Sequence, residues 1–343
     1  MSTYYVREQG AVVRKQEQRL LVTKERNAVM AEIPLHQLDQ LVVMGNVQLT
    51  TQALALLLQA EVDVVFMSLH GKVRGRLVAN ESKFAELRLK QLQVMSNELE
   101  NLALAKAIVV GKLANQLAYL RTALHADVDG FVPKDRGALD KATRGIAEMM
   151  VSAQATGNAD SLRGFEGKAG AWYWSGFRAM LKHDLDFKQR IYHPSPDPVN
   201  ALLSFGYALL QKDVNAAAQL VGLDTYLGFF HTVQYGRPSL VLDLMEEFRP
   251  VLVDPVVVAL LNREAIGKQD FVKGPDKDRP LVMTEAAVKR VIEAYEQRVT
   301  KTTTYPFTNE QTMWRRCLEL QTRQMARVVK GEAKGYRAMN NVQ

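Results

Sequence analysis

The chain has 343 residues, of which 47% are hydrophobic and 24% are charged, and this composition is typical of a globular protein with about two domains. Its single cysteine, Cys317, excludes an intrachain disulfide and a zinc site built from cysteines, and it fits a reducing compartment. The formal net charge is +7, no apolar run reaches the roughly 20 residues that cross a bilayer, and the N-terminus MSTYYVREQG lacks an apolar signal-peptide core, so we expect a cytoplasmic protein with no membrane partner.

Strand signals are confined to residues 1–80. The segment TYYVREQGAVVRKQEQRLLVTKE alternates apolar and polar residues on both sides of Gly10, which predicts half-buried strands. The segment VDVVFMSLHGKVRGRLVA predicts two strands joined by a turn at Gly71, and TTQALALLLQA between them predicts a helix capped by Thr50 or Thr51. We therefore expect a small N-terminal antiparallel β domain.

Helix-forming residues dominate from residue 81 to the end of the chain. Residues 83–124 predict one long helical segment with Gly111 as a candidate kink, and residues 267–280, GKQDFVKGPDKDRP, predict a polar loop. The expected fold is therefore of the α+β class, with the N-terminal β domain followed by a larger all-α domain over residues 81–343.

One acid, Glu166, stands among small and aromatic residues in SLRGFEGKAGAWYWSGF, residues 161–177. Small residues allow a helix to approach its neighbour closely, so a lone carboxylate there is a candidate for contact with a bound group. The alternative is an acid that caps the helix after Ser161, or an exposed helix charge.

Residues 228–250, GFFHTVQYGRPSLVLDLMEEFRP, combine one histidine and three acids with many apolar residues. We expect a helix here with Ser239 as its N-cap, which ends before Pro250. Asp243 and Glu246 are then neighbours three positions apart on the helix. The opposite, apolar face consists of Leu240, Val241, Leu244 and Phe248.

The three acids of this helix, Asp243, Glu246 and Glu247, can converge on a cation, and His231 lies in the turn before them. A charge in so apolar a stretch needs a partner or a metal. One histidine with carboxylates suits Mn²⁺ or Mg²⁺, or a catalytic Zn²⁺ with open positions. A core histidine with satisfied hydrogen bonds is the alternative, and the spacing leaves both open.

The C-terminal tail carries most of the surplus positive charge, with seven basic residues against two acids from Trp314 onward. In a helix one face would hold the basic residues Arg316, Arg323, Arg327 and Lys330. The opposite face would hold the apolar residues Trp314, Leu318, Met325 and Val329. This predicts a docked helix whose cations either contact a phosphate backbone or are merely solvated.

Four motifs, in this order and spacing, resemble the CRISPR-associated protein one family, the integrase subunit that inserts new spacers into a CRISPR array. They are GFEGKAGAWYW, DPVNALLSFGYALL, GLDTYLGFFH and GRPSLVLDLMEEFRP. The resemblance covers nearly the whole chain and implies a small N-terminal β domain followed by a helical catalytic domain. It also implies a catalytic site of Glu166, His231 and Glu246 that binds Mg²⁺ or Mn²⁺, with Asp243 as an adjacent acid that some members also use.

The function implied by the resemblance is a metal-dependent DNA integrase and endonuclease of adaptive immunity, in which a 3′-hydroxyl attacks a phosphodiester of double-stranded DNA. The implied assembly is a homodimer with a small ferredoxin-like partner subunit, which residues 1–80 would contact. Arg237 and Arg249 flank the acidic helix and join Arg323 and Arg327 as candidate DNA contacts. Pairing of Arg237 with a carboxylate, and capping of the helix C-terminus by Arg249, are the alternatives.

Two other functions remain open at this point. The same site with water as the nucleophile would make a stand-alone metal-dependent nuclease that acts on branched or single-stranded DNA in repair. The other function is that of a DNA-binding scaffold whose metal is structural, and this hypothesis predicts that the protein unfolds when the metal is chelated.

Overall fold

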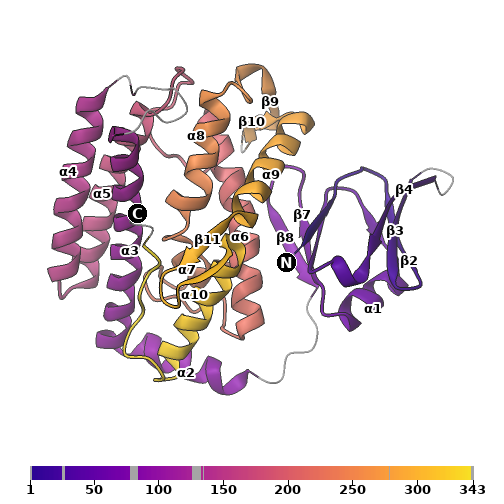
Figure 1. Cartoon of the computed structure of the whole chain (residues 1–343), viewed down its shortest axis with the longest axis horizontal. Coiled ribbons are helices and arrows are strands. Elements are labelled where there is room, and N and C mark those ends of the chain that lie inside the picture. Colours follow the sequence, from indigo (N-terminus) through magenta and orange to yellow (C-terminus); the bar gives the residue numbers. More distant parts are fainter. Residues whose placement is uncertain are drawn as a thin grey trace. The chain divides into compact units, whose positions relative to one another are not determined.

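The computed structural model describes residues 2–24, 28–77, 84–125, 133, 135–277 and 279–340. The chain divides into two compact units, Met1–Lys83 and Phe84–Gln343. The first unit is rich in strands and the second is mostly helical, which confirms the predicted α+β class (Figure 1). The predicted boundary between residues 80 and 81 lies outside the described residues.

The N-terminal unit is built from short strands and one helix. Its elements are β1 (Thr3–Val6), β2 (Val12–Gln16), β3 (Arg19–Lys24), β4 (Ala28–Pro34), β5 (Gln40–Met44), β6 (Gln48–Leu49), α1 (Thr51–Gln59), β7 (Asp63–Met67) and β8 (Val73–Leu77). They form one sheet in the order β1-β5-β7-β8 and another in the order β4-β3-β2-β6. The core includes Val13, Leu20, Leu41, Leu57 and Val64.

Strand direction in these sheets differs in part from the antiparallel pairing that we predicted. The pairs β2–β3, β3–β4 and β7–β8 are antiparallel, but β1–β5, β5–β7 and β2–β6 are parallel. Apolar alternation reports which face of a strand is buried and carries no information on the direction of its neighbour. The local features are confirmed: Thr50 accepts a hydrogen bond from the Ala53 amide as N-cap, and Gly71 turns the chain with φ +89°.

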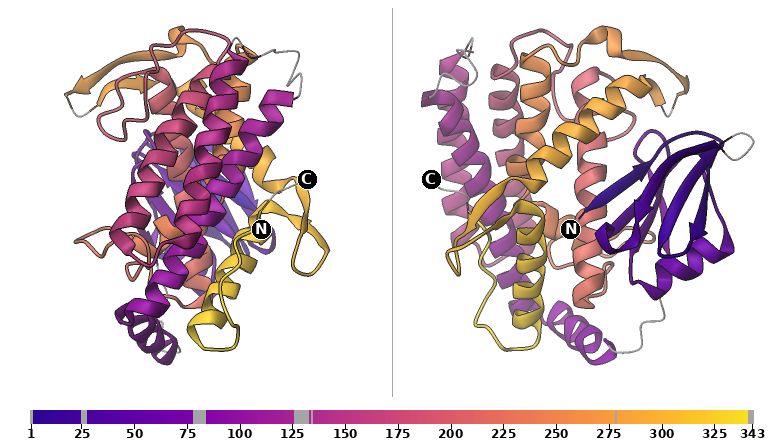
Figure 2. Two further views of the ribbon diagram at one scale, coloured as in Figure 1. Left: turned by 90° about the vertical axis from the view of Figure 1, so that its left-hand side faces the viewer. Right: turned by 45° about the vertical axis from the view of Figure 1, so that its right-hand side comes forward.

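The second unit consists mainly of helices. They are α2 (Ala85–Ser96), α3 (Glu98–His125), α4 (Arg136–Ala155), α5 (Ala159–Ala179), α6 (Pro198–Val221), α7 (Ser239–Met245), the π-helix η2 (Arg249–Val253), α8 (Asp254–Asn262), α9 (Glu285–Thr300) and α10 (Trp314–Val329). The long helices α3, α4 and α5 pack side by side (Figure 2).

The prediction of a loop over residues 267–280 is wrong. It holds a 3₁₀ turn (Lys268–Asp270) and β9 (Phe271–Asp276), which pairs antiparallel with β10 (Arg279–Met283). A second hairpin joins β11 (Thr302–Tyr305) to β12 (Glu310–Met313), so this unit is mostly helical rather than all-α. Such short strands owe their hydrogen bonds to a partner strand, and their own composition resembles that of a loop.

The long helical segment breaks at Asn97 and not at Gly111. The Asn97 side chain accepts hydrogen bonds from the amides of Leu99 and Glu100, which starts α3 as a separate helix. Gly111 lies within α3, and a Cβ built there would come within 2.1 Å of the Ala338 Cβ. The glycine therefore admits the C-terminal segment against the helix.

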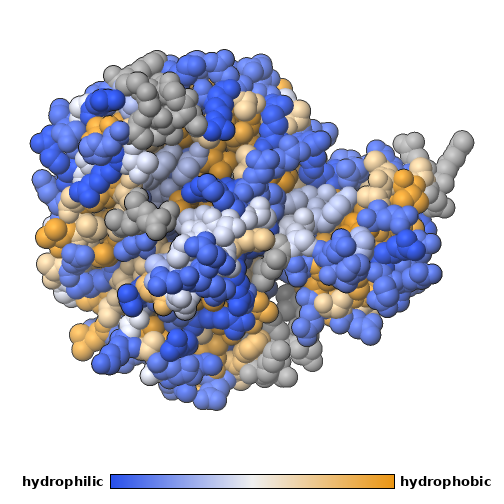
Figure 3. Space-filling model, viewed as in Figure 1, coloured by the Kyte–Doolittle hydropathy of each residue, from blue (hydrophilic) through white to orange (hydrophobic). Residues whose placement is uncertain are grey.

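The face shown in Figure 3 is largely hydrophilic, with hydrophobic residues exposed singly and in small groups. Large exposed hydrophobic side chains include Leu99, Tyr192 and Tyr235. Among the described residues, no helix combines the length and the apolar character needed to cross a membrane.

Candidate functional site

Of the three residues that the resemblance implies as catalytic, the two glutamates contact a lysine, Lys112 of α3, and the histidine lies beside one of them. The Lys112 ammonium forms an ion pair with Glu166 of α5, and its Nζ lies 2.7 Å from Glu246 Oε2, just after α7. His231 Nε2, in the loop before α7, lies 3.7 Å from Glu246 Oε1. Residues 112 and 166 and the segment from 231 to 246, which are distant in the sequence, thus meet in one charged cluster.

The glycines beside Glu166 do not serve helix packing, contrary to our expectation. A Cβ built at Gly164, Gly167 or Gly170 would meet no atom within 4 Å. Close packing of α5 occurs at Gly176 instead, where a Cβ would come within 2.7 Å of Leu120. The side of α5 next to Glu166 therefore borders open space.

Asp243 lies behind the histidine and not between the other acids. Its carboxylate accepts hydrogen bonds from the backbone amides of residues 229, 230 and 231 at 2.6, 3.0 and 2.9 Å. Its Oδ1 also lies 2.6 Å from His231 Nδ1. Since a partner on one ring nitrogen sets the orientation of the other, Asp243 directs Nε2 toward Glu246.

Glu247 points away from the cluster, so the expected convergence of all three acids is wrong. Its buried carboxylate accepts hydrogen bonds from the Tyr336 hydroxyl, the Gln321 amide at 3.2 Å and the Met339 backbone amide at 2.5 Å. Burial raises the pKa of Glu247 to about 7, against the opposing effect of these hydrogen bonds. Because α7 ends at Met245, helical spacing no longer sets the direction of Glu247.

The expected N-cap role of Ser239 is also wrong. The Ser239 hydroxyl donates to the Thr232 carbonyl at 2.9 Å and does not cap the helix amides. This bond closes the loop that carries His231, so the serine holds the loop against the start of α7.

Glu246 remains ionised although it is only 2% exposed. Burial by itself would raise its pKa, but Arg249, Lys112 and His231 more than offset this and lower the pKa to about 2. Burial likewise opposes the charge of Lys112, but the two glutamates raise its pKa. The cluster is therefore a set of charges that stabilise one another around the buried Glu246.

Arg249 lies beside the acids rather than only at the helix end. Its Nη1 is 3.5 Å from Glu246 Oε1, and its guanidinium lies 4.9 Å from the centre of the Tyr207 ring. Tyr207 and Tyr173 donate hydrogen bonds to the two oxygens of Asp254 at 2.6 and 2.5 Å. Burial raises the pKa of Asp254 to about 6.

Sequence reasoning missed Lys112 and Asp254. The one available signal for Lys112 was a charge within the apolar stretch AIVVGKLANQ, but nothing in the sequence shows which acids it meets. Asp254 follows the apolar stretch PVLV, and its tyrosine partners lie 47 and 81 residues away.

The amphipathic division predicted for the tail is confirmed in α10. The basic residues Arg316, Arg323, Arg327 and Lys330 are exposed, whereas Trp314, Leu318, Met325 and Val329 are buried. Arg316 and Arg323 both form ion pairs with Glu319. Arg237 is half-buried in the turn before α7.

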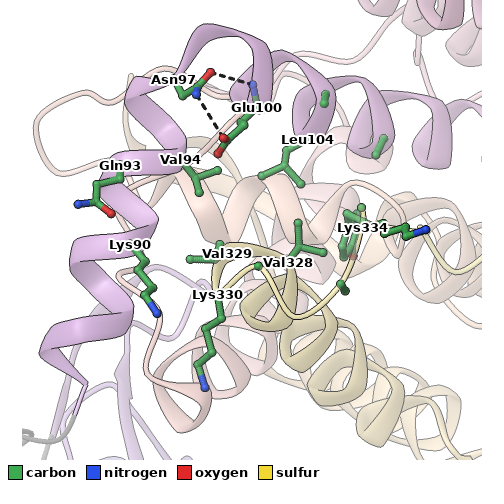
Figure 4. Close-up of a pocket in the computed structure, with 16 residues that line it drawn as sticks. Lys90, Gln93, Val94, Asn97, Glu100, Leu104, Val328, Val329, Lys330 and Lys334 are labelled. Carbon is green, nitrogen blue, oxygen red and sulfur yellow. Dashed lines mark hydrogen bonds between the residues drawn. The ribbon is translucent and has the colours of Figure 1, made fainter.

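A pocket lies apart from the acidic cluster, between α2, α3 and the end of α10 (Figure 4). Lys90, Lys330 and Lys334 are among its lining residues, and Val94 and Leu104 contribute apolar surface. None of the catalytic candidates lines it.

The donor types of the acidic cluster fit a hard divalent cation. Two carboxylates and an imidazole are the donor types that such a cation takes, and at present the Lys112 ammonium lies between the two carboxylates. Within the part of the chain that the structure describes, no three His, Cys, Asp or Glu side chains are gathered closely enough to ligate an ion as they stand.

Comparison with known sequences shows that most of the chain matches the model of one protein family. The model of the family described as CRISPR associated protein Cas1 matches residues 4–297. The CRISPR-associated endonuclease Cas1 1 of Moorella thermoacetica is 33% identical over 340 residues, which is 98% of this chain and 97% of that protein. A CRISPR-associated exonuclease Cas4/endonuclease Cas1 fusion of Geobacter sulfurreducens is 34% identical, and the chain spans only 59% of its length.

Solved structures share the fold. A casposase bound to integration product aligns with a TM-score of 0.83 at 20% identity, over 100% of this chain and 94% of that one. A chain of a Cas6-RT-Cas1–Cas2 complex aligns at 0.82 and 23% identity, over 100% of this chain and 36% of that one. A Cas1 protein from Thermotoga maritima aligns at 0.78 and 22% identity, over 98% and 99%.

Proposed function

The chain belongs to the Cas1 family of CRISPR-associated endonucleases, and from this premise we propose that it is a metal-dependent DNA integrase that inserts new spacer DNA into a CRISPR array. The proposed reaction is attack of a 3′-hydroxyl on a phosphodiester, with hydrolysis by water as a side reaction. The observation that carries the proposal is the meeting of Glu166, His231 and Glu246 in one partly buried, charged cluster.

Glu166, His231 and Glu246 would hold Mg²⁺ or Mn²⁺. When bound, such an ion stabilises the charge that develops on the phosphoryl oxygens and favours ionisation of the attacking hydroxyl. Asp243 orients the imidazole, and Arg249 and His231 help to keep Glu246 ionised. The open side of α5 next to Glu166 leaves room for a DNA strand to approach.

Double-stranded DNA is the proposed substrate, with Arg237, Arg249, Arg323 and Arg327 as contacts to its phosphates. Support comes from the positive stripe of α10 and from the position of Arg249 beside Glu246. Further support comes from the structural neighbour whose title describes a casposase bound to integration product.

A homodimer with a small ferredoxin-like subunit is the proposed assembly, in the cytoplasm, with the N-terminal unit as the contact region. Its support is the neighbour whose title names Cas1 together with Cas2. We propose accordingly that residues 1–80 serve assembly and that residues 81–343 serve catalysis.

The proposal is tested by integration of a short DNA duplex into a supercoiled repeat plasmid, with Mn²⁺ and the partner subunit supplied. Glu166→Gln and Glu246→Gln should each abolish joining and leave DNA binding nearly intact. Glu332→Gln, which neutralises an exposed acid, is the matched control and should join as the wild type does.

A stand-alone nuclease is the second candidate, because the curated relatives are named endonucleases. It predicts that the plasmid is cut without joining and without any need for the partner subunit. Cutting without joining would contradict the integrase proposal in favour of the nuclease. Joining activity in Glu246→Gln would show that the proposed catalytic site is wrong.

A further inference from the structure

Lys112 is held in place independently of the glutamates that it contacts. Its neighbour Gly111 packs against Ala338, and Asn115, one turn further along α3, donates hydrogen bonds to the carbonyls of Glu247 and Met339 at 2.8 and 2.9 Å. The Lys112 side chain is 12% exposed. These contacts fix the backbone position of Lys112, and the conformation of its flexible side chain sets the position of the ammonium.

The Lys112 ammonium is the group that joins the two glutamates. It contacts Glu166 Oε1 and Glu246 Oε2, whereas Arg249 and His231 lie near the other oxygen of Glu246. Two carboxylates in a buried site repel each other unless a cation lies between them. Without the ammonium, and without a metal, Arg249 would remain as a cation that acts on both glutamates, and it lies 3.5 Å from Glu246 Oε1, on the side away from the Lys112 contact.

We infer that Lys112 is a tethered counter-cation that orders Glu166 and Glu246 before a metal binds and that a divalent cation must displace to reach both carboxylates. The inference rests on the proposed metal site and assigns Lys112 a positioning role in it. Ammonium and metal compete for the same oxygens, and they repel each other if both remain. Metal affinity is therefore lower than the ligands alone would provide, while the site stays assembled without metal.

The test measures Mn²⁺ binding to the full chain without DNA, from the electron paramagnetic resonance signal of free Mn²⁺. Lys112→Gln removes the charge and keeps a side chain of similar length, and it should bind Mn²⁺ about tenfold or more tightly than the wild type. Lys112→Arg keeps the charge and should bind as weakly as the wild type. Lys141→Gln, on the exposed surface of α4, is the control for net charge and should change nothing.

Thermal melting gives a second readout that does not depend on activity. In EDTA, Lys112→Gln should melt at a lower temperature than the wild type, because the buried Glu246 and the half-buried Glu166 lose the cation between them. Added Mn²⁺ should raise its melting temperature more than it raises that of the wild type. If the variant does not fold without metal, folding in Mn²⁺ supports the inference, and failure to fold there overturns it.

The possible failures are distinguishable. If Lys112→Gln binds Mn²⁺ no more tightly than the wild type, while Glu246→Gln abolishes binding, the metal site stands and the role of Lys112 is wrong. If neither the wild type nor Lys112→Gln binds Mn²⁺, the proposed metal site is wrong, and the inference falls with it.

Discussion

Asp243 and Glu246 stand three positions apart, but the fold gives them different neighbours. The Asp243 carboxylate accepts hydrogen bonds from three backbone amides and also contacts His231 Nδ1, so its partners all lie within the protein. Glu246 turns one oxygen to Lys112 and the other toward Arg249 and His231. From this difference we propose Glu246 as the direct metal ligand and Asp243 as the residue that orients the histidine.

Asp243→Asn should therefore weaken catalysis without abolishing it. We expect strand transfer to fall about 10- to 100-fold, the range for partners that orient a metal ligand. The measurement is integration across a series of Mn²⁺ concentrations, with Glu246→Gln, expected to be inactive, assayed beside it. Loss of all activity in Asp243→Asn together with retained activity in Glu246→Gln would show that Asp243 is the direct ligand.

At the scale of elements, α5, α6 and α8 meet at one buried carboxylate, Asp254. Tyr173 of α5 and Tyr207 of α6 donate to its two oxygens, and the ring of Tyr207 lies under Arg249. Burial raises the pKa of Asp254 to about 6, and the two hydroxyls and nearby arginines oppose the rise. The three helices that support the site are thus joined through a titratable group.

This junction should make stability depend on pH. The folded-state pKa of Asp254, about 6, exceeds the ordinary value of 3.8, so the folded state holds the proton more tightly than the unfolded state. The resulting stability is fully present below the unfolded pKa and is lost as the pH rises through 6. From pH 7.5 to pH 5 the wild type should gain about 1.4 kcal/mol relative to Asp254→Asn.

Urea unfolding followed by tryptophan fluorescence measures this difference, because Trp172, Trp174 and Trp314 all lie in the helical unit. Subtracting the variant from the wild type removes the titration of other groups. If the difference in free energy of unfolding between the wild type and Asp254→Asn does not change with pH, Asp254 does not take up a proton between pH 7.5 and pH 5.

At the scale of the whole molecule, surplus positive charge collects on α10 and the segment after it. The apolar side of α10 is buried, which leaves its basic residues on the surface. Glu319 neutralises part of this charge through Arg316 and Arg323. Glu247 anchors the following segment through Tyr336 and Met339. The tail is therefore a docked surface with a net positive charge.

Replacing Arg323 and Arg327 together with alanine should weaken DNA binding to a similar extent for unrelated sequences. Fewer counter-ions would be released, so the dependence of affinity on salt should also become less steep. Fluorescence anisotropy over a salt series measures both effects. Alanine at Lys141 and Arg144 of α4 removes the same charge elsewhere and should have less effect. If neither the affinity for DNA nor its dependence on salt changes, the basic residues of α10 are merely solvated and do not contact DNA.

The sequence by itself determined the features that depend on neighbours along the chain. Alternation and turn residues predicted the hairpin at Gly71, side-chain capping chemistry predicted Thr50, and helical spacing predicted the two faces of α10. Each depends on residues a few positions apart, so local propensity and amphipathicity suffice. For the catalytic candidates Glu166, His231 and Glu246 the resemblance of the motifs was required, because spacing alone left a core histidine open.

Only the tertiary structure decided how distant segments meet. It placed Lys112 between Glu166 and Glu246, which lie 54 and 134 positions further along the chain. It also turned Glu247 toward the C-terminal segment, paired β1 with β5 in parallel and formed the β9–β10 hairpin. Such contacts depend on packing between elements, and the free energy of burying a charge depends on which partner the completed fold brings to it.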